Sequence, residues 1–297
     1  MPSAGRRTHY WLTFAVLAVA VSSYSLMQSL TVPVLSEIET QMDTDQTTVT
    51  WVLTAYLLSA SVFTPVMGRL GDAYGKQRLL VISLGALAIG SLVAALAPSI
   101  EVLIFARVIQ GAGGGVLPLA FGVIRDEFPV AKVGGAVSII SSLLAVGFGA
   151  GIVLAGPITS TLGYHWLFWL PFIVTAVAAV VSIIVVPESP VRTPGRIAVL
   201  PVVLLSSWLV ALLLGLSQAP KWGWGSPGTI GAPGGRRDRS HSLDLRRLRV
   251  DVPLIDMKMM RLPGVWTTNL VALLVGTGMY ASFGFIPQFN QTPSSNG

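Results

Sequence analysis

Charged residues and glycines alternate in one short stretch between two long apolar runs. The stretch from Gly68 to Arg78 holds one acid, Asp72, among three basic residues. Its glycines allow a tight turn where two helices nearly touch, and an acid among bases favours a charge-pair latch, with Arg125 as one local partner for the acid. A solvated basic loop is the simpler alternative. We predict a gating motif that comprises Gly68, Asp72, Gly75, Lys76 and Arg78.

A second polar signal is Arg107, which lies inside an apolar run. A charge at the centre of a membrane helix costs about 2.5–3.5 kcal/mol on insertion scales, so it usually faces a bundle interior or a watery cavity. The residues that share its helical face are small: Gly111, Gly114, Gly115 and Pro118. A second helix can approach such a face closely. Snorkelling to the interface is the alternative. We select Arg107, Gln110 and Gly111 as transport candidates.

A third stretch is rich in small residues and contains Gly147, Gly151, Gly156 and Pro157. Small residues at four-residue spacing make a groove for helix packing, and the proline removes one backbone donor. Ordinary membrane-helix glycines explain the pattern equally well.

The sequence offers little material for catalysis or for metal binding. It contains no cysteine, which excludes disulfides, thiolate chemistry and cysteine zinc sites. Its histidines, His9, His165 and His241, are far apart. We therefore expect no catalytic residue, no cofactor and no metal, and a membrane-embedded enzyme is disfavoured.

The composition indicates that most of the surface faces lipid. Of 297 residues, 53% are hydrophobic and 11% are charged, with a mean hydropathy of +0.72, whereas soluble domains carry about 25% charged residues. The net charge is +6. Because the basic residues lie mostly in short connections between apolar runs, we expect a lipid bilayer as partner and no nucleic acid.

Eight apolar runs are long enough to span a membrane. They lie at about 10–34, 49–67, 79–98, 102–123, 134–158, 166–187, 198–218 and 265–288. The first is too long for an ordinary signal peptide, because no charge interrupts it until Glu37. Nine basic residues lie in the connections on the side of the N-terminus, and none lies in the opposite connections after the first, third and fifth runs. The positive-inside rule therefore predicts a cytoplasmic N-terminus in a multi-pass protein of the inner or plasma membrane.

The motifs together resemble the major facilitator superfamily, and within it the fourteen-span drug:proton antiporter group. The stretch from Gly68 to Arg78 matches the family's G-x-L-x-D-x-x-G-x-[RK]-[RK] signature, except for Gln77. The run that begins at Arg107 resembles R-x-x-x-G-x-[GA], and Trp51 to Tyr56 resembles W-x-x-[TS]-[AS]-Y. The stretch from Gly147 onwards resembles part of the antiporter signature G-x-x-x-G-P-x-x-G-G. It departs from that signature at Ile152, Ser160 and Thr161.

The resemblance implies a fold of two six-helix halves, each an inverted pair of three-helix repeats. It also implies that Asp72 latches the halves together on the inner face, and that Arg107 takes part in proton coupling. The implied substrates are small amphiphilic or cationic molecules, exported against protons. One departure is Tyr24, which stands where that group carries an aspartate. Since no acid precedes Glu37, proton antiport is implied by the resemblance alone.

The C-terminal part of the sequence fits the family less well. Residues 231–249 contain six arginines, and inserting them into a bilayer would cost on the order of 10 kcal/mol or more. Yet Lys258 and Arg261 precede the last run as in an inner loop. We expect a disrupted reading frame there, or alternatively an amphipathic surface helix. Without a second half, the face of Arg107 and Gln110 should be open to lipid or to another copy of the chain.

The predicted protein is thus an all-α integral membrane protein. Residues 1–195 form an N-terminal six-helix transporter half and residues 196–226 a linker membrane helix. Residues 227–251 form an Arg-rich non-membrane segment, and residues 252–297 one further span, with the C-terminal bundle missing. The predicted function is small-molecule efflux in the intact relative, and the alternative is a non-transporting membrane fragment.

Overall fold

The computed structural model describes residues 10–189, 199–223, 225–226 and 257–291. The chain divides into two compact units, residues 1–252 and residues 253–297, which are described separately. All elements in the described residues are helical. The predicted Arg-rich segment 227–251 lies outside the described residues, so its interpretation stays a prediction.

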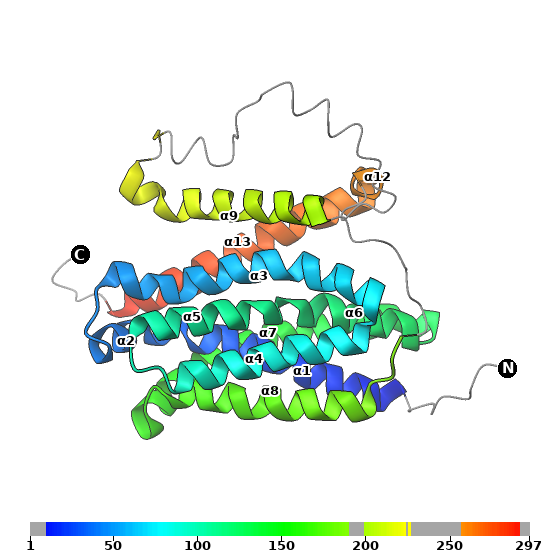
Figure 1. Cartoon of the computed structure of the whole chain (residues 1–297), viewed down its shortest axis with the longest axis horizontal. Coiled ribbons are helices and arrows are strands. Elements are labelled where there is room, and N and C mark those ends of the chain that lie inside the picture. The colour runs from blue at the N-terminus through cyan, green and yellow to red at the C-terminus, as the bar shows by residue number, and fades with distance from the viewer. Residues whose placement is uncertain (1–9, 190–198, 224, 227–256, 292–297) are drawn as a thin grey trace. The chain divides into compact units, whose positions relative to one another are not determined.

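In the first unit, the long helices up to residue 185 run side by side as one bundle (Figure 1). Its elements are α1 (Tyr10–Leu30), η1 (Val32–Val34), α2 (Leu35–Gln41), α3 (Gln46–Tyr74), α4 (Lys76–Ala95), α5 (Ile100–Gly111), η2 (Ala112–Gly115), α6 (Val116–Glu127), α7 (Val130–Leu162) and α8 (Trp166–Val185). Helix α1 contacts both α7 and α8, α3 packs on α5, and α4 packs on α8. A further helix, α9 (Val199–Trp222), contacts α3.

Within the described residues, seven helical segments are long and apolar enough to cross a membrane. They coincide with the first seven predicted spans, which confirms a multi-pass membrane protein. The second unit contains α12 (Met257–Met260) and α13 (Pro263–Gln291). The predicted range 265–288 lies entirely within α13.

Two predicted spans are interrupted where their sequences disfavour α-helix. The first predicted span breaks after Leu30, and Pro33 lies in the short 3₁₀ turn η1, since proline removes a helix hydrogen bond. The fourth breaks at η2, where three successive glycines lower helix propensity. Both breaks put a 3₁₀ turn within a span that was expected to be one continuous helix.

Helix α3 is longer than predicted because both of its ends are capped. The Asp45 carboxylate accepts hydrogen bonds from the backbone N–H groups of Thr47 and Thr48 at 2.7 and 2.9 Å. These bonds, that from the Thr48 backbone first, lower the pKa of Asp45. At the other end Gly75 adopts φ +118°, a region that favours glycine, and its N–H bonds to the Gly71 carbonyl at 3.0 Å.

Candidate functional site

The turn between α3 and α4 positions most of the predicted gating motif. A Cβ at Gly71 would lie 2.3 Å from the terminal Cδ2 of Leu119 on α6, so a larger residue there would displace that side chain. At Gly75 a Cβ would lie 2.4 Å from a carboxylate oxygen of Glu188, and its φ of +118° favours glycine in addition. Gly68 is only in ordinary contact distance of Pro118, at 3.6 Å. Gly75 is therefore the position of this turn where glycine is needed most.

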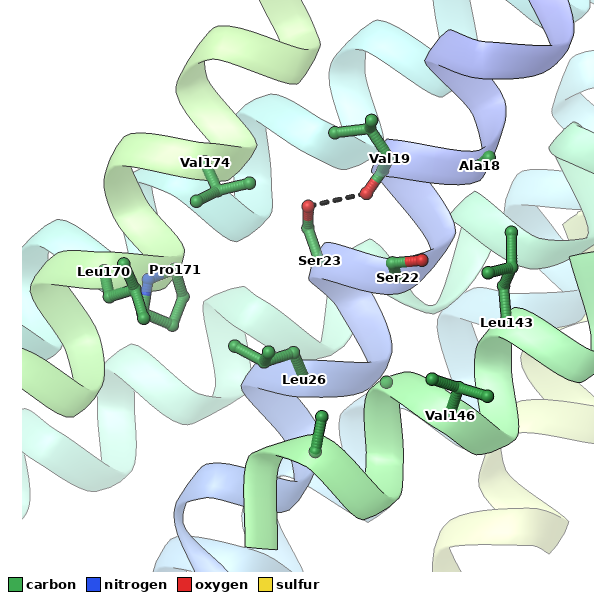
Figure 2. A pocket seen from close by; sticks show the side chains of 12 residues that line it. Ala18, Val19, Ser22, Ser23, Leu26, Leu143, Val146, Leu170, Pro171 and Val174 are labelled. Atoms are coloured by element: carbon green, nitrogen blue, oxygen red, sulfur yellow. Dashed lines mark hydrogen bonds between the residues drawn. The ribbon is translucent and has the colours of Figure 1, made fainter. Parts of the chain in front are cut away.

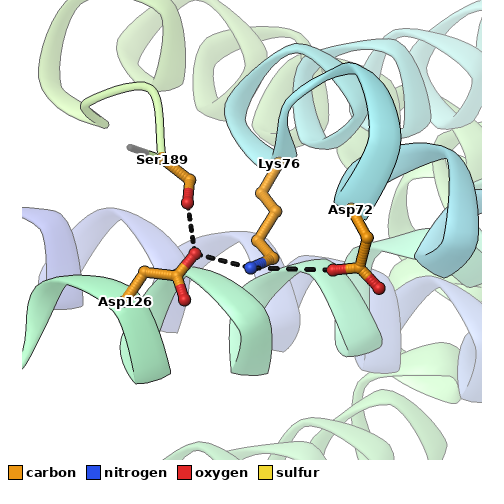
Figure 3. Close-up of polar contacts among 4 residues, drawn as sticks. All are labelled: Asp72, Lys76, Asp126 and Ser189. Atoms are coloured by element: carbon orange, nitrogen blue, oxygen red, sulfur yellow. Dashed lines mark hydrogen bonds and ion pairs between the residues drawn. The ribbon is translucent and has the colours of Figure 1, made fainter. Parts of the chain in front are cut away.

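Lys76 is the centre of a charged cluster at this end of the bundle (Figure 3). Its Nζ lies 2.5 Å from Asp126 Oδ2 and 3.6 Å from Asp72 Oδ1. The Lys76 and Asp126 side chains are 10% and 7% exposed, whereas Asp72 is 45% exposed. The Ser189 hydroxyl donates to Asp126 Oδ2 as well. A single lysine thus ties the start of α4 to the end of α6, and Asp126 in turn binds the segment that follows α8.

Two further contacts hold the end of α8 and the segment after it. Arg78 Nε lies 3.5 Å from Glu188 Oε2, with Arg78 68% exposed and Glu188 24% exposed. The Gln77 side-chain amide donates to the carbonyls of Ser182 and Ile183 at 3.4 and 3.2 Å. Gln77, which replaces a basic residue of the family signature, therefore forms hydrogen bonds with the last turn of α8.

The structure corrects the expected ion-pair partner of Asp72 and adds three residues to the charged cluster. In the described part of the chain, the ion pair of Asp72 is formed with Lys76 and not with Arg125. Asp126, Glu188 and Ser189 were not selected from the sequence. A usable signal was present, because each follows an apolar run on the side of the bundle where the basic connections lie.

Arg107 lies inside the bundle, fully buried with Gln110 and Ser91 at 0% exposure. Its Nε donates to the Val52 carbonyl at 3.0 Å and its Nη1 to Gln110 Oε1 at 2.7 Å. The Gln110 amide then donates to Ser91 Oγ at 3.0 Å. This set, Arg107, Gln110, Ser91 and the Val52 carbonyl, is called the buried network below. Because the Arg107 side chain is bonded inside the bundle, it does not snorkel to the membrane interface. The expectation that Arg107 and Gln110 are open to lipid is wrong, because α3 and α4 cover them.

An aromatic side chain completes the surroundings of Arg107. The guanidinium carbon lies 4.5 Å from the ring centroid of Tyr56, within the range of a cation–π interaction. Tyr24 of α1 lies beside Tyr56 and within electrostatic reach of Arg107. The position where the family resemblance led us to expect an acid therefore contributes a phenol to the same region.

The glycines after Arg107 explain how the helices come so close. A Cβ at Gly111 would lie 2.3 Å from Ser59 Cβ, and one at Gly115 would lie 2.5 Å from Met67 Cβ, both on α3. At Gly113 it would meet Leu87 of α4 at 2.1 Å. The Ser59 hydroxyl, in turn, donates to the Val108 carbonyl at 2.6 Å. This confirms the prediction of close helix approach along the span, although a 3₁₀ turn and not a single α-helical face provides it.

The small residues of α7 divide into two pairs. A Cβ at Gly147 would lie 3.0 Å from the Ser22 carbonyl, and one at Gly151 would lie 1.9 Å from Ser29 Oγ. These two glycines form the predicted groove, and α1 fills it. Gly156 has open space around it, and Pro157 is exposed within a helix that continues past it. The packing interpretation thus holds for the first pair only.

The described residues contain no group of three or more His, Asp or Glu side chains that could hold a metal ion. The described residues form a six-helix membrane bundle, which has a charged cluster at one end and the buried Arg107 in its interior. Together these features define a polytopic membrane protein of the transporter class.

Comparison with known proteins identifies the family. Residues 17–294 match the family model of the Major Facilitator Superfamily, and the chain belongs to that superfamily. It is 28% identical over 262 residues to the tetracenomycin C resistance and export protein of Streptomyces glaucescens, covering 88% of this chain and 49% of that protein. It is 32% identical over 201 residues to the lincomycin resistance protein LmrB of Bacillus subtilis, covering 66% of this chain and 42% of that protein. The chain spans about half the length of the curated relatives it matches.

Solved transporter structures share the fold. The POT family transporter PepTSo superposes with a TM-score of 0.54 at 14% identity, over 82% of this chain and 55% of that chain. A D-xylose-proton symporter gives a TM-score of 0.52 at 16% identity, over 61% of this chain and 49% of that one. At these identities the likeness concerns the fold alone.

Proposed function

We propose that this chain supplies the N-terminal half of a small-molecule exporter that works by proton antiport, with amphiphilic or cationic compounds as substrates. The observation that carries the proposal is the buried network around Arg107. A fully buried arginine is expensive in a membrane and usually marks a transport or proton pathway. The matched relatives support export: the Streptomyces protein is a resistance and export protein, and the Bacillus protein is a resistance protein.

Arg107 would act through its charge. Its partners in the network are a carbonyl, an amide and an aromatic ring, which stabilise the guanidinium without removing its charge. A fixed cation favours the deprotonated form of an acid that comes near it. In the proposed cycle that acid lies on the second six-helix bundle, and its protonation state changes as the two bundles move. Gln110 keeps the guanidinium in place.

The charged cluster would serve the gate. Lys76, Asp126 and Ser189 hold the α3–α4 turn, the end of α6 and the segment after α8 together, so the gating motif can move as one rigid piece. Asp72 is 45% exposed and so remains accessible to a partner on the second bundle. Alternating access in this fold is the rocking of one bundle against another around a central site.

A chimera provides the direct test. Residues 10–189 replace the corresponding part of the tetracenomycin exporter, and the chimera is expressed in a strain without its own exporters. We expect dye efflux that an uncoupler abolishes. Arg107→Ala should remove it, whereas the control Lys132→Ala, at an exposed basic residue outside the gating motif, should retain most of it. Efflux that is insensitive to the uncoupler, or unchanged by Arg107→Ala, contradicts proton antiport through this site.

The same assay addresses the alternative of a non-transporting fragment. Because the site needs a second bundle, we expect the 297-residue chain alone to give no efflux. Efflux by the chain alone that collapses with an uncoupler and with Arg107→Ala would instead indicate two copies that form a complete pore.

For the membrane orientation, we propose that the N-terminus and the α3–α4 turn are cytoplasmic. The cysteine-free sequence allows single cysteines at Asp43 and Tyr74. Both positions are exposed, unlike Lys76, which is 8% exposed. A membrane-impermeant maleimide added to intact cells should label position 43 and not position 74. The reverse pattern would invert the orientation.

A further inference from the structure

A crevice with a volume of about 520 Å³ lies between α1, α7 and α8 (Figure 2), and none of its lining residues belongs to the buried network. Helix α1 forms its floor, and α7 and α8 form its walls. Small side chains on the floor and lower wall, Ala18, Ser22 and Ala150, leave the space open. Val19 on the floor and Val146 on a wall are 49% and 64% exposed, so the crevice opens to the medium around the bundle.

The lining of the crevice is almost entirely apolar, which favours a hydrocarbon ligand. Among its twelve lining residues, the polar side chains are those of Ser22 and Ser23. The Ser23 hydroxyl already donates to the Val19 carbonyl at 2.6 Å. Sites for drug-sized molecules normally add a few convergent polar groups that fix the orientation of the ligand. This crevice has the size of such a site but not its polar groups, so an occupant is held by shape and by apolar contact.

The depth of the crevice places it within the hydrocarbon layer. Ser22 follows the start of α1 by about 18 Å at helical rise, and Leu170 follows the start of α8 by about 6 Å. The hydrocarbon core of a bilayer is about 30 Å thick. These depths place the crevice within the thickness of the hydrocarbon layer, where acyl chains would surround it.

We propose that this crevice binds one acyl chain of a membrane phospholipid, as a site distinct from the general lipid contact of the other helices. The acyl chain enters from the side, past the exposed Val19 and Val146, lies against Ala18 and Ser22 on α1, and fills the space between α7 and α8. An exported compound is a poorer occupant, because the lining offers it no charge and only one hydroxyl that is not already bonded to Val19. The proposal does not rest on transport activity.

The experiment uses the full chain in phosphatidylcholine nanodiscs that contain a phosphatidylcholine with a diazirine in one acyl chain. After irradiation, crosslinked residues are mapped by mass spectrometry. We expect severalfold more crosslinking at Val146 and Leu170 than at Ile89 of α4, which is 58% exposed and outside the crevice. Ala150→Phe fills the crevice and should abolish the excess. Ala145→Phe, on an exposed position of the same helix outside the crevice, should leave it unchanged.

A second filling variant, Ala18→Leu, approaches the crevice from α1 and should act like Ala150→Phe, with monodisperse elution showing that each variant is folded. Equal crosslinking at Val146, Leu170 and Ile89 would overturn the proposal, because it would show general lipid contact only. An excess that a cationic dye displaces would also overturn it, since the occupant would then be an exported compound.

Discussion

Lys76 and Arg107 are both buried cations of one helical bundle, and their partners differ in kind. Lys76 lies between two carboxylates, at 2.5 and 3.6 Å, at an end of the bundle where Asp72 still meets the medium. Arg107 lies in the interior, where its hydrogen bonds go to a backbone carbonyl and a side-chain amide, and where an aromatic ring lies 4.5 Å away. The charge of Lys76 is balanced locally, as a structural tie requires. The carbonyl, the amide and the ring beside Arg107 are neutral, so these three partners hold its position without cancelling its charge.

This difference separates two uses of a buried charge. An ion pair fixes helices relative to one another and loses its effect on other groups, because the opposite charges cancel at a distance. A guanidinium held by neutral groups keeps its electrostatic influence on any group that approaches it. The comparison therefore predicts that substitutions in the buried network and in the charged cluster differ in both size and consequence.

The largest effect is expected for Arg107→Ala. The substitution leaves the buried Gln110 amide oxygen without the Arg107 donor, removes the side-chain bond to the Val52 carbonyl, and opens a cavity. We expect a loss of about 3 kcal/mol or more in the free energy of unfolding, measured by titration with sodium dodecyl sulfate in mixed micelles. Arg107→Lys should recover only part of it, because an ammonium lacks the planar fork that reaches both acceptors. Full stability of Arg107→Ala would show that the network contributes little to the fold.

The next effect concerns Lys76 and Asp126. Because both side chains are mostly buried, Asp126→Asn should cost about 2 kcal/mol by leaving the lysine without its nearest countercharge. A double-mutant cycle with Lys76→Met should give a coupling energy of about 1–3 kcal/mol. The matched comparison is Arg107→Met with Gln110→Leu, a charged–neutral pair in the interior. Additive effects for Lys76 and Asp126 would remove the distinction between the two regions.

Much of this architecture was predictable from the sequence, because membrane spans have a strong signal in length and apolarity. The first seven spans and the close approach at Gly111 and Gly115 needed no further information. The breaks at Pro33 and at the glycines of η2 were also encoded locally, but their effect depends on how neighbouring helices accommodate a 3₁₀ turn.

Partner choice in the polar sites was less predictable, because it depends on tertiary contacts. Asp72 has three basic residues close in sequence, yet the tightest ion pair of the motif joins Lys76 to Asp126, fifty positions away. Similarly, helical spacing within the span places Gln110 near Arg107, but the Val52 carbonyl is supplied by another helix. A pattern within one segment identifies such candidates without naming the partner.

A smaller effect is expected at the Arg78–Glu188 pair. Arg78 is 68% exposed and the closest approach is 3.5 Å, so solvent screens the interaction and the coupling should be below about 1 kcal/mol. Glu188→Gln keeps the shape of the side chain and isolates the charge. Raising the salt concentration should reduce the coupling further. A coupling as large as that of Lys76 with Asp126 would mean that the whole end of the bundle behaves as one desolvated network.

The smallest effect is expected for Asp72→Asn, and it is the sharpest test of the comparison because Asp72 and Asp126 contact the same ammonium group. Asp72 lies 3.6 Å from Lys76, is 45% exposed and lies four positions before it, across the α3–α4 turn. Such partly exposed pairs contribute about 0.5 kcal/mol. In unfolding titrations Asp72→Asn should therefore be nearly as stable as the parent chain, whereas Asp126→Asn is clearly destabilised. In the chimera with a second bundle, however, Asp72→Asn should reduce efflux, because the exposed carboxylate is the one free to reach across. A large stability loss in the chain alone would place Asp72 with Asp126 as a local structural contact. An unchanged efflux rate in the chimera would remove its proposed role in the gate.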